Sequence, residues 1–170
     1  AGVGMLATVV NRDLRDPGLQ ARLADSAYVV GGDGHLFLNS GRDYVVTGAL
    51  STSYLSGAPA AIARLQRSSA RYFQRPDATH LTLDPAADTL AGWNLQTDFT
   101  RNMGSVRPNA SFWAVSPGYE VNDVGYMTSA DKMGMHAGIV WLKPTPDAFS
   151  RSRNLVVATW YVWNFAHEKM

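Results

Sequence analysis

Apolar and polar residues alternate along most of the chain with a period of two, not the 3.6 of a helix. Residues 90–101 show the pattern most clearly, with one apolar face and one polar face. The apolar face holds Trp93, Leu95 and Phe99. The polar face holds Asn94, Gln96 and Asp98. Such alternation predicts a strand that separates two different environments.

Similar alternation, or a composition rich in Val, Trp and Tyr, predicts seven more strands. They are residues 3–10, 27–38, 44–54, 80–83, 109–115, 136–142 and 155–164. Turn-forming residues separate them at 16–18, 39–41, 56–59, 102–104 and 117–118. The glycine-rich stretch 31–34 fits either a hairpin turn or a strand that glycine weakens.

Residues 60–75 break the alternation. Ile62, Leu65, Ser69 and Phe73 recur at near-helical spacing, which predicts a helix in the first half of this segment. The second half, 69–74, alternates well enough to form a strand.

The predicted fold is all-β: an antiparallel meander of about eight strands that fills residues 1–170 as a single region. Long alternating strands, joined in turn by short turns and longer loops, are typical of transmembrane β-barrels. Tyr44 and Tyr54 bracket one strand, as aromatic residues do at the two membrane interfaces. A soluble β-sandwich or small barrel gives a similar pattern, because aromatic residues favour strands in general.

Composition removes several other functions. The net charge is +1, so the chain lacks the basic surface of a nucleic-acid-binding protein, and we expect no nucleic-acid partner. The absence of cysteine excludes disulfides, thiolate metal sites and a cysteine nucleophile. The four histidines are not paired at i+2, i+3 or i+4, so we expect no metal site and no cofactor.

Two stretches resemble a bacterial family. Residues 70–78 (ARYFQRPDA) are similar to the ARYYQRPDA stretch of the DUF5916 family. Residues 116–126 (SPGYEVNDVGY) are similar to its SPGFEVNDLGF segment, with Tyr119 and Tyr126 in place of phenylalanine. Ala130 and Asp131 follow where the family tends to have Arg-Ala-Asp. The resemblance spans about residues 1–164.

This resemblance implies a section of a β-barrel-like region that follows a carbohydrate-binding family 9-like domain in the outer membrane of a Gram-negative bacterium. The partners would be the lipid bilayer, carbohydrate and the remaining strands of the parent chain. Taken alone, such a section would form an open curved sheet with exposed edges. The resemblance also favours a strand for residues 69–76, and it supplies no catalytic residue.

The polar cluster after the turn at 117–118 is the most distinctive candidate binding site. Its members are Tyr119, Glu120, Asn122, Asp123 and Tyr126. Oxygen ligands at this spacing suit Ca²⁺, or sugar hydroxyls held beside the tyrosine rings. Alternatively, the Asn and Asp side chains cap backbone groups of a structured loop.

Three arginines also have alternative interpretations. Arg71, Arg75 and Arg107 would line a lumen or contact lipopolysaccharide phosphates, because a barrel interior tolerates charge that the lipid face does not. Otherwise they are solvated or pair with Asp77 or Asp84.

The predicted function is an outer-membrane barrel section that serves as a pore or as an anchor for a carbohydrate-binding domain, without bond-making chemistry. Asn94, Gln96 and Asp98 would then face the lumen. One alternative is a soluble carbohydrate-binding sandwich that stacks sugars on Trp93, Trp113 or Trp141. Another is a membrane-associated glycoside hydrolase or esterase, which needs a carboxylate pair or a triad.

Overall fold

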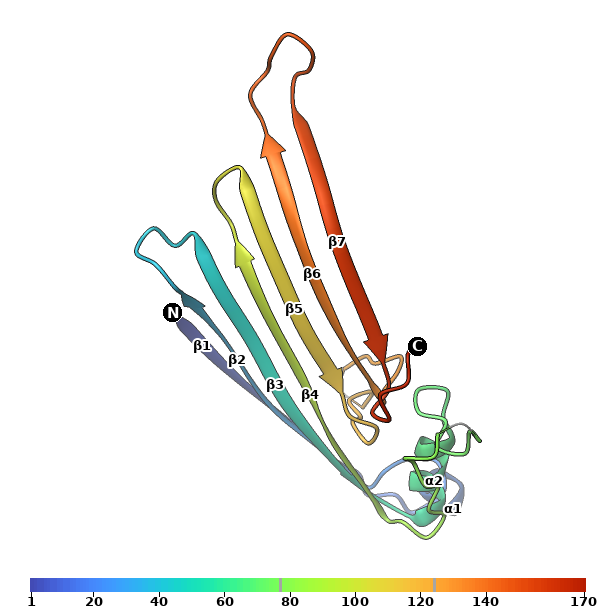
Figure 1. Ribbon diagram of the computed structural model, residues 1–170. Coiled ribbons are helices and arrows are strands. Elements are labelled where there is room, and N and C mark those ends of the chain that lie inside the picture. Colours follow the sequence, from blue (N-terminus) through green and yellow to red (C-terminus); the bar gives the residue numbers. More distant parts are fainter. Residues whose placement is uncertain (77, 124) are drawn as a thin grey trace.

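The computed structural model describes residues 1–76, 78–123 and 125–170. It contains one seven-stranded antiparallel sheet in which strands that follow one another in sequence are also neighbours in space (Figure 1). The strands are β1 (Gly2–Asn11), β2 (Ser26–Phe37), β3 (Tyr44–Ser56), β4 (Thr89–Arg101), β5 (Val106–Val115), β6 (Lys132–Lys143) and β7 (Arg153–Trp163). The predicted all-β meander is confirmed, as a single open sheet.

Two predicted strands are wrong. Residues 80–83 form irregular loop, because His80 is held by a carboxylate from another loop instead of by a neighbouring strand. Residues 69–76 form turns, in which Arg71 donates a hydrogen bond to the carbonyl of Tyr119 in the β5–β6 connection. The helical half of that segment is confirmed as α2 (Pro59–Arg67), and the glycine-rich stretch 31–34 lies within β2 as strand.

The two ends of the sheet differ. Short connections, 38–43, 102–105 and 144–152, join strands at one end, here called the short-turn end. Long connections, 12–25, 57–88 and 116–131, join them at the other, the long-loop end. The long-loop end also carries both helices, α1 (Pro17–Gln20) and α2 (Figure 1, lower part). Helix α1 occupies the place of the turn predicted at 16–18, and Asp16 caps its N-terminus.

The register assigns every strand residue to one of two faces. Residues directly opposite each other in an antiparallel ladder project from the same face. By this rule, one face carries the odd-numbered residues of β1, β4, β6 and β7 and the even-numbered residues of β2, β3 and β5. We call it the apolar face, and the opposite side of the sheet the polar face.

Buried side chains gather at the long-loop end. Leu55 on β3 and Ile62 on α2 have no exposed surface, and Leu90 on β4 is also buried. Away from this end, large apolar side chains lie open on the sheet, such as Leu50 and Ile139, each 52% exposed. Neither helix in the described part of the chain has the length and apolar character needed to cross a bilayer.

Candidate functional site

The connection between β5 and β6 folds back onto the polar face at the long-loop end. The hydroxyls of Tyr119 and Ser51 lie 2.6 Å apart, and the Glu120 amide donates to the Ser53 hydroxyl at 2.9 Å. A Cβ at Gly92 would lie 2.1 Å from the Tyr119 amide nitrogen. Glycine on β4 is therefore what allows the loop backbone to lie directly against the strand.

A buried ion pair joins this loop to the segment that follows α2. Arg71 and Glu120 lie 2.8 Å apart, and their side chains are 0% and 3% exposed. Arg71 also donates to the Tyr119 carbonyl, and Glu120 accepts from the Asn122 amide at 2.5 Å. Burial lowers the pKa of Arg71, and the Glu120 carboxylate opposes that shift.

Asp131 holds three segments together at the same end of the sheet. Its carboxylate is fully buried and accepts from Arg75 and from the Phe165 amide at 3.2 Å. The Nε2 atom of His80 lies 2.9 Å from Oδ1 of Asp131, the oxygen that also accepts from the Phe165 amide. The carboxylate therefore connects the loop before β4, the loop before β6 and the segment after β7.

Four of the five predicted binding residues share one hollow of about 540 Å³. Glu120, Asn122, Asp123 and Tyr126 line it together with residues of the β1–β2 loop and the end of α2. Tyr126 is 86% exposed. Tyr119 does not line the hollow, because it is buried between the loop and the polar face.

Three of these four residues, Glu120, Asn122 and Asp123, already have partners for their side chains within the chain. Asn122 Oδ1 accepts from the Met127 amide at 2.7 Å, and Asp123 forms an ion pair with Arg12. Glu120 is held by Arg71, as described above. These contacts brace the loop, so they match the structured-loop alternative as well as a binding role.

The residues predicted to face the lumen lie together on the polar face of β4. Asn94, Gln96 and Asp98 point to the side on which the long loops pack, and Gln96 Nε2 donates to Asp98 at 3.1 Å. Gln96 and Asp98 also line a shallow hollow of about 290 Å³ with Asp33 and His35 of β2. Trp93, Leu95 and Phe99 lie on the opposite, apolar face.

The three tryptophans named for a sugar platform do not share a surface. Trp93 and Trp141 lie on the apolar face, whereas Trp113 lies on the polar face, opposite Gly134. A Cβ at Gly134 would lie 2.5 Å from the Trp113 ring, so the ring covers the space that glycine leaves.

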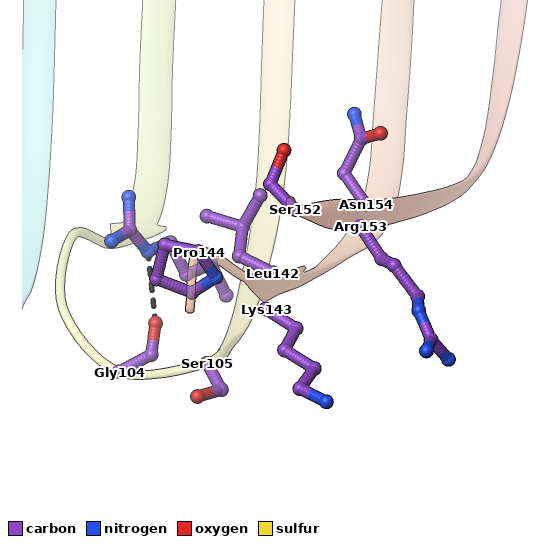
Figure 2. A pocket seen from close by; sticks show the side chains of 9 residues that line it. Gly104, Ser105, Leu142, Lys143, Pro144, Ser152, Arg153 and Asn154 are labelled. Carbon is purple, nitrogen blue, oxygen red and sulfur yellow. Dashed lines mark hydrogen bonds between the residues drawn. The ribbon is translucent and has the colours of Figure 1, made fainter. Parts of the chain in front are cut away.

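A second hollow, of about 580 Å³, lies at the short-turn end (Figure 2). Its walls come from the β4–β5 turn, the β6–β7 loop and the adjoining ends of β6 and β7, and they include Gly104, Leu142 and Asn154. Figure 2 shows that Lys143 and Arg153 direct their charged ends away from the side chains of Leu142 and Asn154.

Sequence reasoning missed the partners of the buried charges. Arg71 contacts Glu120 and Arg75 contacts Asp131, whereas Asp84 instead accepts from the Ala86 amide at 2.9 Å. The other predicted partner, Asp77, lies outside the described residues. The pairs join loops that are far apart in sequence, and residue spacing carries no signal for such contacts.

No group of three or more His, Cys, Asp or Glu side chains that could hold a metal ion occurs within residues 1–76, 78–123 and 125–170. Comparison of the chain with family models, curated proteins and solved structures finds no match. The resemblance to the DUF5916 family therefore stays a prediction that rests on the two sequence stretches.

Proposed function

We propose that this chain forms part of the wall of a β-barrel in the outer membrane of a Gram-negative bacterium. The apolar face meets lipid, and the polar face lines the interior. The observation that carries the proposal is the distribution of charge over the sheet. Within the seven strands, the charged residues of the apolar face are Arg101, Lys143 and Arg153, each at the short-turn end of its strand. Asp33, Asp98 and Lys132 all lie on the polar face.

The apolar face matches a bilayer in height. Tyr44 and Tyr54 lie on this face ten residues apart along β3. At about 3.3 Å per residue, and with the ~40° tilt of barrel strands, the two rings are about 25 Å apart along the membrane normal. That separation equals the height of the apolar band between the aromatic girdles of outer-membrane barrels.

The large apolar side chains exposed on this face support contact with a partner whose surface is apolar over a wide area. Met5, Leu50, Ile139 and Val157 are 87%, 52%, 52% and 64% exposed. Contiguous apolar patches of this extent are rare on soluble monomers and indicate a membrane or protein contact. The described residues form one sheet, whereas the sandwich alternative needs a second sheet to cover this face.

The lengths of the connections also support a barrel wall. Short turns at one end and long loops at the other are the arrangement of outer-membrane barrels, in which the long loops are extracellular. The β5–β6 loop packs onto the polar face through Ser51 and Ser53, so it would lie over one mouth of the interior. The role we propose is a pore wall that also anchors the rest of its parent chain, with selection by lumen shape and polarity.

The test is fractionation of the full-length protein in a Gram-negative host. We expect it in the outer membrane after a urea wash, and we expect its band to shift on a gel between unheated and boiled samples. A resident porin of the same fraction is the control for both steps. A protein that the urea wash removes, and whose band does not shift, would contradict the proposal.

A further inference from the structure

Positive charge is concentrated at the short-turn end of the sheet. The segments 38–43, 101–107 and 143–153 contain six Lys or Arg residues and two carboxylates, Asp43 and Asp147. The six are Arg42, Arg101, Arg107, Lys143, Arg151 and Arg153. The segments of the long-loop end, widened by two residues into the strands to 10–27, 55–90, 114–133 and 162–170, contain nine Lys or Arg against ten Asp or Glu. The two ends therefore differ in sign, although the whole chain is nearly neutral.

Three of these cations border the apolar face. Arg101 ends β4 and lies over the ring of Tyr44, with its Cζ atom 5.3 Å from the ring centroid. Lys143 ends β6 next to Trp141 of the same face, two residues earlier, and Arg153 begins β7 directly opposite Lys143. The cations thus form the margin of the apolar band, next to Tyr44 and Trp141, whose rings are of the kind that favours a membrane interface.

A hydrogen bond to the neighbouring strand fixes Arg101 at this margin. Its Nη1 atom donates to the Val106 carbonyl at 3.1 Å. Lys143 and Arg153 share a single carboxylate, that of Asp147, each at 2.5 Å. Two cations on one anion leave a net positive charge next to the apolar surface.

We propose that this margin binds the phosphate groups of anionic glycerophospholipids, in the leaflet that surrounds the short turns. The inference rests on the proposed function, because it needs the apolar face to be surrounded by lipid. The acyl chains would cover the apolar face, and the headgroup would lie level with Arg101, Lys143 and Arg153. Each basic residue near an anionic lipid surface strengthens association by about fivefold.

The test measures which lipids surround the full-length protein in vesicles of phosphatidylcholine. Electron paramagnetic resonance of chain-labelled phosphatidylglycerol and phosphatidylcholine gives the fraction of each lipid that the protein immobilises. We expect a preference for phosphatidylglycerol of about fivefold or more at low salt, with a weaker preference at physiological salt. The triple variant Arg101→Gln, Lys143→Gln, Arg153→Gln should bind both lipids equally.

A matched triple variant removes the same charge from the opposite end of the sheet. Arg22, Arg67 and Lys169 are exposed at the long-loop end, and changing each to Gln should leave the preference intact. Asp147→Asn should increase the preference, because the amide oxygen can still accept from the Phe149 and Ser150 amides while the counter-charge is lost. A purely structural role of these cations does not predict an increase.

The outcomes separate the two proposals. Immobilised lipid without a preference for phosphatidylglycerol would overturn the headgroup site and leave the barrel wall standing. An equal loss of preference in the two triple variants would also overturn the site, because it would reflect net charge alone. The absence of any immobilised lipid would overturn the proposed function itself.

Discussion

Leu95→Arg tests the placement of the apolar face in lipid. Leu95 pairs with Leu50, which lies four residues from Tyr54 and six from Tyr44 on β3. At about 3.3 Å per residue and a ~40° tilt, Leu95 lies about 10 Å from the Tyr54 ring and about 15 Å from the Tyr44 ring along the membrane normal. The side chain therefore lies near the midplane, where an arginine destabilises a barrel by about 2–4 kcal/mol.

The assay is equilibrium unfolding in urea of the full-length protein, refolded into vesicles. Two variants provide matched controls. Gln96→Arg places the same side chain on the exposed polar face of the same strand, and we expect little change. Val106→Arg places it at the short-turn margin of the apolar face, where the cost is about 0–1 kcal/mol. Equal destabilisation by Leu95→Arg and Gln96→Arg would refute the assignment of faces.

Three further predictions concern the loops. Arg71→Met should destabilise the folded protein by about 3–5 kcal/mol in the same assay, because it leaves the carboxylate of Glu120 buried without its partner. Gly92→Ala should displace the loop around Tyr119 and speed its proteolysis, because the new Cβ would overlap the loop backbone. The Asp147 carboxylate should titrate, by nuclear magnetic resonance, with a pKa well below the usual 3.8, mainly because of its hydrogen bond to Lys143.

Each of these has a result that would count against it. The double variant Arg71→Met, Glu120→Gln should be less destabilised than Arg71→Met, and equal stability of the two would show that the pair is not coupled. Gly48→Ala is the control for the glycine, because its nearest neighbour beyond the adjacent residues lies 3.7 Å from the new Cβ. A loop equally sensitive to protease in both variants would argue against close packing at Gly92.

The pH dependence of the Asp147 contacts has a definite sign. The folded-state pKa is lowered, so the stabilisation is complete above the ordinary value of 3.8 and is lost as the pH falls through the folded-state value. The β6–β7 loop should therefore keep its contacts to Lys143 and Arg153 at pH 5. A titration midpoint at or above 3.8 would contradict this.

Strands were predictable where alternation follows two environments. In β4 the sequence pattern predicts both the strand and its faces, because Leu95 and Gln96 differ sharply in polarity. In β7 the residues are apolar on both sides, and even Trp160 on the polar face is 71% exposed. There the assignment of faces needs the register with β6, which no local pattern contains.

The loops were less predictable for a physical reason. Residues 69–74 alternate like a strand, yet Arg71 is buried because Glu120, 49 residues further along the chain, neutralises it from another loop. The polar cluster from Tyr119 to Tyr126 was recognisable as a distinct loop. The residues that pair with this cluster, such as Arg12 with Asp123, come from other loops, and the local sequence does not show how these loops meet.

The central claim is that one face of the sheet meets lipid and the other does not. The chain contains no cysteine, so single variants Leu95→Cys and Gln96→Cys can each carry one fluorophore on adjacent residues of β4. With the full-length protein in vesicles, brominated lipid tails should quench the probe at position 95, and aqueous iodide should quench the probe at position 96. Equal quenching of both probes by both reagents would contradict the account.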